Sequence, residues 1–283
     1  MEMKAIRICM QNIRKWSGNR RIKMCIAMTI LLVYSYTKDL SILCNNMGQK
    51  INPWIFPFLF AFRYMRIVFI VPVIFIFCDA PFVDTNQTYI MLRTKRSIWS
   101  VGQILYIIIC SFLYTLLHLF FTIIFNIRYM QWGITWGDVL GSAGTSGIMT
   151  SLNIRYNTVG ISGSVIRYFT PMQAMFFSFI LMWLSFVFVG MLIYVINIVT
   201  RTKGLGIIVA GFFVLLNAIV DGKPYLYKFS PLTWSYIGCI DVGGRTQCPT
   251  ITYVLFSYII IITIFSVISI IAGNRQEVVV YNE

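Results

Sequence analysis

The side chains that most often carry out catalysis are scarce in this chain. It has one histidine, nine acidic residues and seven cysteines among 283 residues. The cysteines form no CxxC pair and do not lie at metal-ligand spacing from the histidine, so the sequence predicts no zinc or iron–sulfur site. An HExxH motif and a GxxxxGK[ST] phosphate-binding loop are also absent. We therefore expect that the chain is not an enzyme and binds no metal or cofactor of its own.

Three polar residues inside apolar stretches are candidates for a substrate path. Arg63 and Arg66 are three positions apart, so they share a helical face. They could line a path for an anionic group or pair across an interface, or their side chains could extend to the outer lipid headgroups. His118 lies among leucine and phenylalanine residues, where it is either a hydrogen-bonded packing residue or a proton relay. The sequence leaves these alternatives open.

These residues belong to a chain with the composition of an integral membrane protein. Hydrophobic residues make up 58% of it, charged residues 11%, and the mean hydropathy is +0.78. A soluble domain has about 45–50% apolar and about 25% charged residues. The net charge of +14 would favour a nucleic-acid partner in a soluble protein, but here the basic residues flank apolar segments. That pattern favours membrane lipid as the partner and predicts no nucleic-acid binding.

The hydropathy pattern divides the chain into an N-terminal segment and a membrane domain. In residues 1–23, apolar and basic residues recur at roughly helical spacing, which predicts an amphipathic helix on the membrane surface. Residues 24–283 form the membrane domain, in which Pro171 opens the fourth helix. The fold class is thus an all-α integral membrane protein with six transmembrane helices. They are expected at about 24–44, 59–78, 102–126, 172–199, 205–220 and 251–271.

The distribution of basic residues predicts the orientation of these helices. With six spans, thirteen of the 23 lysines and arginines fall on four short segments of one side: 1–23, 79–101, 200–205 and 274–283. Because cytoplasmic loops are enriched in lysine and arginine, we expect both termini in the cytoplasm. The second outer loop then contains Cys239 and Cys248, which could form a disulfide on an oxidising side, with Cys44 as a rival partner.

The stretch Cys78–Val101 is a long polar interruption that carries a basic cluster. Its first half has the residues of a turn, with Pro81 after Ala80 and with nearby aspartates. Its second half interleaves apolar and basic residues, which predicts a short amphipathic helix at about 86–96. Such a helix lies on a membrane surface or docks on a partner protein.

The run PWIFPFLF...DAPFVD...Y..LRTKRSIWSVGQILYI, within residues 53–107, resembles the membrane subunits of small ABC-type (ATP-binding-cassette) exporters of low-GC Gram-positive bacteria. In those permeases a cytoplasmic coupling helix between the second and third spans docks on a separate ATPase subunit. The resemblance implies a permease in the bacterial plasma membrane, paired with a second permease chain that is identical or homologous. ATP and Mg would be held by the ATPase subunit. The residues expected to contact it are Phe82, Asp84, Tyr89, Leu92, Arg93, Lys95 and Arg96.

Other functions remain open at this point. The basic residues of the coupling segment could serve only to anchor the chain on the cytoplasmic side. The expected spans hold almost no carboxylates, which argues against a proton- or sodium-coupled transporter. By analogy, an exporter of this kind would carry an amphipathic peptide, lipid or drug-like molecule. The alternatives are a non-transporting scaffold or immunity protein that binds a peptide through its outer loops, and a channel or carrier without an ATPase.

Overall fold

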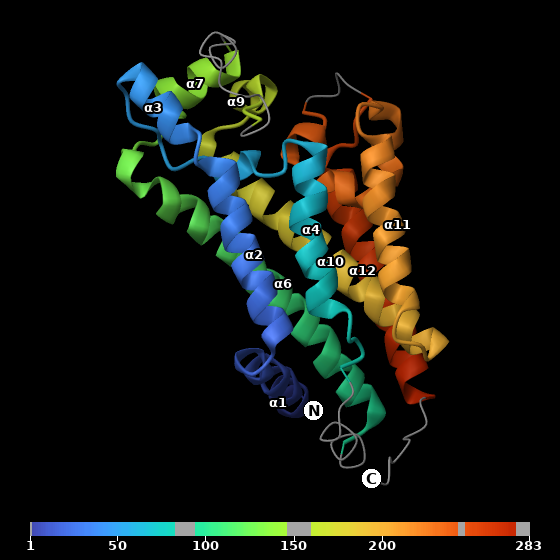
Figure 1. Cartoon of the computed structure of the whole chain (residues 1–283). Coiled ribbons are helices and arrows are strands. Elements are labelled where there is room, and N and C mark those ends of the chain that lie inside the picture. Colours follow the sequence, from blue (N-terminus) through green and yellow to red (C-terminus); the bar gives the residue numbers. More distant parts are fainter. Residues whose placement is uncertain (1, 83–93, 146–159, 243–246, 276–283) are drawn as a thin grey trace.

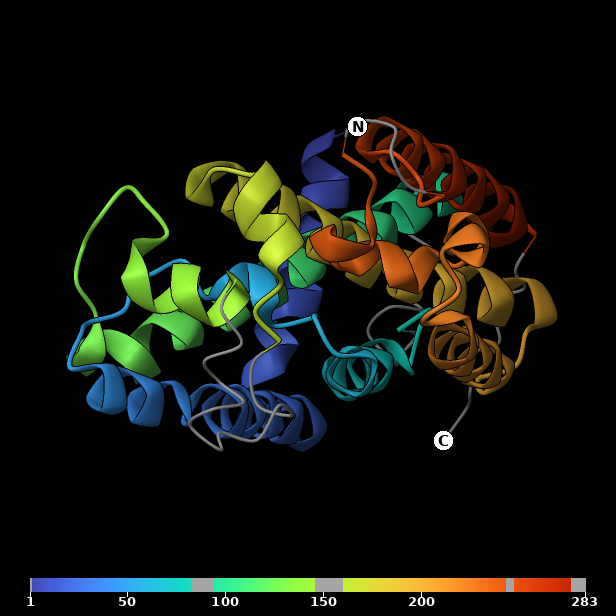
Figure 2. The same ribbon diagram turned by 90° about the horizontal axis from the view of Figure 1, so that it is seen from above.

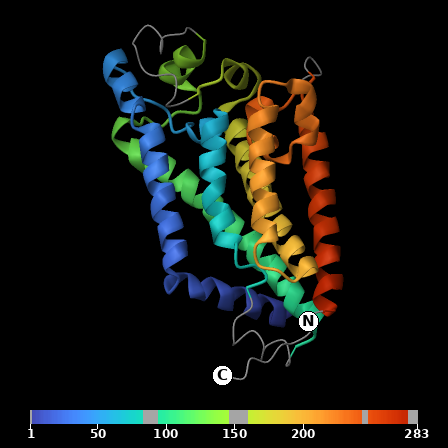
Figure 3. The same cartoon turned by 45° about the vertical axis from the view of Figure 1, so that its right-hand side comes forward.

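The computed structural model describes residues 2–82, 94–145, 160–242 and 247–275, which form helices joined by loops, with no β-strand among them. The main helices run between two ends of the molecule, which we call the lower end and the upper end as they lie in Figure 1. The view in Figure 3 shows the same arrangement. These helices are α2 (Arg20–Thr37), α4 (Arg63–Phe77), α6 (Arg96–Asn126), α10 (Pro171–Thr200), α11 (Leu205–Val220) and α12 (Ile251–Asn274).

Helix α10 is the centre of the bundle. It packs against α4, α6, α11 and α12, and 72% of its most apolar stretch is buried. The residues of α10 itself are apolar on every face, as expected for a helix that other helices enclose. Seen from above, α2, α4 and α11 form a row on one side, while α12 lies against α10 and α6 (Figure 2).

The start of α10 follows the sequence prediction. Thr170 Oγ1 accepts a hydrogen bond from Gln173 N at 3.4 Å, and Gln173 Oε1 accepts one from Thr170 N at 3.1 Å. This capping box satisfies two backbone N–H groups that have no partner within the helix. Pro171 occupies the first turn, where its missing N–H has no consequence.

Four helical segments are long and apolar enough to cross a membrane, as expected for an integral membrane protein. They are Arg20–Met47, Arg96–Tyr129, Pro171–Thr200 and Ile251–Asn274. The other two predicted spans correspond to α4 and α11, which have 15 and 16 residues. At about 1.5 Å per residue each is roughly 23 Å long, shorter than a hydrocarbon core of about 30 Å. Six spans therefore stay a prediction.

Short helices cover the upper end (Figure 1). The first predicted span consists of α2 and the short helix α3 (Leu40–Met47) that follows it. Helix α3 contacts α7 (Gly137–Thr145). Trp54 Nε1 donates to Gly133 O at 3.0 Å, and Trp136 Nε1 donates to Phe169 O at 3.0 Å. These bonds join segments of the upper end to one another. The other short elements are α9 (Gly163–Tyr168), η1 (Lys15–Ser17), η2 (Phe56–Phe58), η3 (Ile127–Tyr129), η4 (Pro224–Phe229), η5 (Pro231–Ser235) and η6 (Ile237–Cys239).

The N-terminal helix is shorter than predicted and is docked on the bundle. Helix α1 (Glu2–Arg14) ends nine residues before the predicted limit of 23, and α2 already begins at Arg20. The side chains of Ala5, Ile8 and Cys9 in α1 are buried, and α1 packs along α6. A second apolar stripe stays exposed and can enter a membrane surface; it consists of Met3, Ile6 and Met10.

Gly102 allows α1 to approach α6. A Cβ atom at this position would lie 2.9 Å from Ile8 Cβ and 3.2 Å from Ala5 O. We predict that Gly102→Ala lowers the free energy of unfolding by about 1–3 kcal/mol, because this contact has no room for a methyl group. It should also speed the labelling of Cys9, now 1% exposed, by a maleimide, as followed by peptide mass spectrometry.

The matched control is Gly211→Ala in α11, since a Cβ atom there would have nothing within 4 Å. It should leave the labelling of Cys9 unchanged. Equal labelling of Cys9 in wild type and a folded Gly102→Ala variant would contradict the packing of α1 on α6.

Candidate functional site

The connection that follows α4 begins with a tight turn, Cys78–Phe82, which we call the elbow turn. Ala80 N donates to Phe77 O at 3.0 Å, and Phe82 N donates to Asp79 O at 2.7 Å. Pro81 keeps the chain from continuing as a helix, because the residue before a proline disfavours helical backbone angles. The elbow turn lies at the lower end of the bundle (Figure 1).

Asp79 joins the elbow turn to α2. Its carboxylate accepts a hydrogen bond from Arg21 Nη2, and the two side chains form an ion pair. The hydrogen bond from Arg21 lowers the pKa of the Asp79 carboxyl group below its ordinary value. The side chains of Arg21 and Asp79 are 32% and 55% exposed, so water screens their attraction. The pair positions the turn more than it stabilises the fold.

Asn197 joins the elbow turn to α10 and α11. This side chain is buried, its Nδ2 donates to Ala80 O at 2.8 Å, and its Oδ1 accepts from Gly206 N at 2.9 Å. One amide therefore satisfies a carbonyl of the turn and an N–H in the first turn of α11. Gly206 must be glycine for this contact, since a Cβ atom there would lie 2.7 Å from Asn197 Oδ1.

Phe82 joins the elbow turn to α6. Its ring meets the Tyr106 ring edge-on, with centroids 4.8 Å apart. Tyr106 OH in turn accepts a hydrogen bond at 2.9 Å from Nε1 of Trp16, which lies in η1. Tyr106 therefore contacts both the elbow turn and η1. The elbow turn thus contacts α2, α10 and α6 through Asp79, Ala80 and Phe82, and Asn197 links it to α11.

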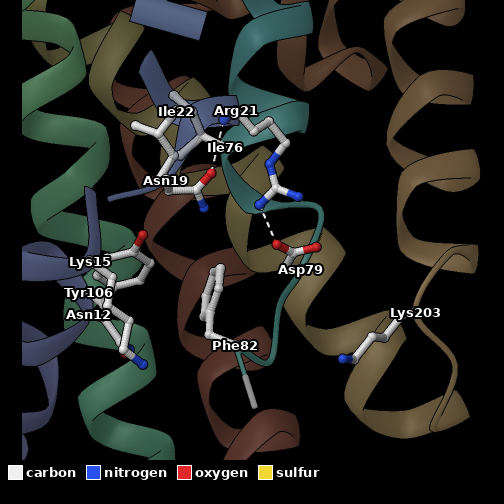
Figure 4. A pocket seen from close by; sticks show the side chains of 10 residues that line it. All are labelled: Asn12, Lys15, Asn19, Arg21, Ile22, Ile76, Asp79, Phe82, Tyr106 and Lys203. Atoms are coloured by element: carbon white, nitrogen blue, oxygen red, sulfur yellow. Dashed lines mark hydrogen bonds and ion pairs between the residues drawn. The ribbon is translucent and has the colours of Figure 1, made fainter. Parts of the chain in front are cut away.

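A cavity of about 350 Å³ lies beside the elbow turn (Figure 4). Its polar wall comes from α1, η1, α2, the elbow turn and the turn between α10 and α11. Among the described residues it includes three cationic side chains and one carboxylate. The polar lining residues are Asn12, Lys15, Asn19, Arg21, Asp79 and Lys203. The apolar lining residues are Ile22, Ile76, Phe82 and Tyr106. We call this cavity the lower pocket.

The predicted contacts with an ATPase are described in part. Phe82 is half-buried and packs on Tyr106. Its contact with an ATPase stays a prediction. Lys95 is exposed just before α6, and Arg96 Nη1 donates to Asn274 O at 3.1 Å, at the end of α12. The rest of the predicted set lies outside the described residues, as does most of the helix expected at 86–96: Asp84, Tyr89, Leu92 and Arg93.

Arg63 and Arg66 have different environments. Arg66 is 1% exposed and pairs with Asp221, which follows the last residue of α11; its Nη1 also donates to Cys239 Sγ at 3.6 Å. Arg63 is outside this cluster, and its guanidinium carbon lies 4.8 Å from the centre of the Tyr64 ring. The two arginines therefore do not line a common path. Of the roles that the sequence left open for these arginines, Arg66 fits pairing across an interface. That interface lies between α4 and α11.

His118 is a packing residue in this structure. It is 0% exposed, and its Nδ1 lies 2.8 Å from Tyr114 O in the same helix. The rings of Phe69, Tyr114 and Phe186 surround it with centroids 4.7–5.7 Å away. Its Nε2 has no hydrogen-bond partner among the described residues, so no relay of hydrogen bonds leaves the ring.

The predicted disulfide between Cys239 and Cys248 is not present in the structure. Cys239 is buried in η6 beside Arg66, and burial raises the pKa of its thiol to about 11. A thiol of high pKa is almost entirely protonated near neutral pH, whereas the thiolate is the form that reacts to make a disulfide. Cys44 is not bonded to either cysteine. Among the residues that the structure describes, no group of three His, Cys, Asp or Glu side chains is placed to hold a metal ion.

Several residues that organise the ends of the bundle were not predicted. The sequence could have singled out Asn197, because an amide inside an apolar span is energetically costly unless it has a hydrogen-bond partner. Asp221 marks the end of the fifth predicted span, but nothing near it in the sequence identifies Arg66, 155 positions away, as its partner. Arg21 is likewise one of many basic residues in the N-terminal segment.

No protein-family model, no curated protein and no solved structure matches this chain. The geometry of the lower end is therefore the basis for assigning a function.

We predict that Asn197→Ala destabilises the protein by about 1–3 kcal/mol, because it leaves Ala80 O and Gly206 N buried without their partner. The free energy of unfolding, measured by titrating the protein in mild detergent with sodium dodecyl sulfate, tests this value. Thr200→Ala is the control on the same helix. That hydroxyl is exposed, so its loss should change stability by less than about 0.5 kcal/mol. Equal stability of the two variants would exclude Asn197 as the link between the elbow turn and α11.

Proposed function

We propose that this chain is the permease subunit of an ABC transporter and that it exports an amphipathic peptide, lipid or drug-like molecule. The observation that carries the proposal is the set of contacts made by the elbow turn. This turn begins the connection between the second and third predicted spans. Within five residues it contacts α2, α6 and α10, and Asn197 of α10 links it to α11. A force applied to the connection would therefore act on most of the bundle at once.

The energy for transport would come from a separate ATPase subunit. The chain has no nucleotide-binding motif, so ATP and Mg would be bound by that partner. The connection between α4 and α6 would dock on it in the manner of the coupling helix of the permeases that this sequence resembles. The exposed Lys95 is suited to an acidic groove on such a partner.

In this proposal the lower end faces the cytoplasm of a bacterial cell and the bundle has six spans. The lower end holds the elbow turn together with α1 and the turn 201–204, and the last two are basic segments of the chain. A cytoplasmic position for them agrees with the excess of lysine and arginine on that side of a membrane. The two short helices α4 and α11 would be accommodated by local thinning of the bilayer.

The transport path would lie between two permease chains. The interior of one chain is filled at mid-height by Phe69, His118 and Phe186, each of which is 0% exposed. Such packing has no room for a solute. A second copy of this chain, or a homologous chain, would therefore supply the other wall of the path.

The decisive experiment is purification of the tagged chain from its own cells in mild detergent, followed by mass spectrometry and an ATP hydrolysis assay. We predict that an ATPase accompanies the wild type in a near-equal amount. A variant with Arg93→Glu and Lys95→Glu should lose most of it, since both substitutions reverse charges of the proposed docking segment.

The control carries the same charge change at Lys4→Glu and Arg7→Glu, on the exposed face of α1. It should retain the ATPase. A folded wild type that brings down no ATPase would refute the permease function, and would favour a scaffold that binds a peptide at the upper end.

A further inference from the structure

One loop of the upper end carries two large, strongly exposed apolar side chains. The loop consists of residues 130–136, between η3 and α7, and it runs along the edge of the molecule in Figure 2. Trp132 is 79% exposed and Ile134 is 88% exposed, more than any other large hydrophobic residue in the described part of the chain. An exposed apolar side chain can simply face water, so the surroundings of these two decide their role.

Hydrogen bonds fix this loop on the segment 51–54. Gly133 O accepts from Trp54 Nε1 at 3.0 Å, and Thr135 O accepts from Asn52 Nδ2 at 2.7 Å. Two backbone hydrogen bonds of 2.9 Å also join Ile51 to the chain on either side of residue 130. The exposed side chains are thus presented by an ordered loop, and binding through them would not include the entropic cost of ordering it.

Two glycines allow the loop to lie so close to the segment 51–54. A Cβ atom at Gly133 would be 2.9 Å from Asn52 Nδ2, and one at Gly137 would be 3.0 Å from the same atom. Gly137 also has a φ of +73°, a backbone conformation that favours glycine. The inner side of the loop is therefore packed against the protein, while Trp132 and Ile134 extend from it.

The three tryptophans in this region use their indole N–H groups differently. Trp54 and Trp136 each donate to a backbone carbonyl at 3.0 Å, and Trp136 is buried. Trp132 makes no such hydrogen bond to any residue that the structure describes. An exposed indole with an available N–H suits the boundary between lipid and water, because its ring contacts acyl chains while the N–H meets headgroups or water.

The loop also continues an apolar stripe along α6. The stripe is exposed and recurs every three or four positions, which places it on one side of the helix; its members are Leu113, Leu116, Phe120, Ile124 and Ile127. The exposed Arg128 follows it, as expected for a cation at the level of the headgroups. The 31 residues of α6 span about 47 Å, more than a hydrocarbon core of about 30 Å, so even a tilted α6 reaches the headgroups.

We propose that Trp132 and Ile134 insert into the boundary between headgroups and acyl chains at the upper end. The ligand is the lipid surface itself, and Trp132 is the interfacial anchor. This contact holds the upper end of α6 at a fixed depth in the membrane, together with the segment 51–54 that is bonded to the loop. The insertion follows from the membrane location of the chain and does not depend on the permease function.

The test is tryptophan fluorescence of the full chain in lipid nanodiscs, with two quenchers. One is phosphatidylcholine brominated near the headgroup end of its acyl chains, and the other is acrylamide dissolved in the water. The difference between wild type and Trp132→Phe isolates the emission of Trp132 from that of the remaining tryptophans, and the exposed site should tolerate the change. We expect the brominated lipid to remove most of this emission, and acrylamide to quench it about threefold less than tryptophan in water.

Two variants that each add one tryptophan complete the test. Ile134→Trp should add emission that responds as that of Trp132 does. Thr145→Trp is the matched control, at the exposed end of α7 near the top of Figure 1. Its emission should respond to acrylamide and little to the brominated lipid.

Three results would overturn the proposal. Strong quenching of Trp132 by acrylamide, with little by the brominated lipid, would place the loop in water. Protection of Trp132 from both quenchers would mean that protein covers the loop, such as a second copy of this chain. Equal quenching of Trp132 and the Thr145→Trp control by the brominated lipid would mean that the loop is no closer to lipid than the rest of the upper end.

Discussion

The organisation of the lower end depends on one buried amide, Asn197. In an apolar bundle no water is present to satisfy backbone groups, so each carbonyl or N–H that leaves a helix needs a partner from the protein. Ala80 O and Gly206 N are two such groups, and Asn197 binds both. The elbow turn is consequently fixed against the start of α11, and its neighbours Asp79 and Phe82 are held where they meet α2 and α6.

The upper end has a corresponding link. Arg66 of α4 is almost fully buried and pairs with Asp221, which follows α11. Removal of one member of a buried ion pair usually destabilises a protein strongly, because the remaining charge has no partner. Helix α4 is therefore connected to the α10–α11 region at both of its ends. A displacement of the elbow turn would be transmitted along α4 to the opposite side of the bundle, which is what a coupled permease requires.

The sequence predicts the helices of this fold better than their contacts. Apolar runs and Pro171 are local features, so they identify the membrane helices and the start of α10. The amphipathic pattern of residues 1–23 indicates a helix with an apolar face, but it cannot say that this face packs on α6, because Gly102 is far away in the sequence. The partner of Arg66 is hidden for the same reason. Pairings of this kind depend on tertiary structure that single-sequence patterns do not contain.

The most direct test of the account is hydrogen–deuterium exchange of wild type and an Asp79→Asn variant in lipid nanodiscs. We predict that loss of the pair with Arg21 speeds exchange at residues 78–82 and also at the start of α11, residues 205–210, because Asn197 joins these segments. Exchange at the start of α12, residues 251–256, should stay unchanged. Faster exchange confined to the surroundings of Arg21 and Asp79 would contradict the claim that the elbow turn and α11 form one mechanical unit.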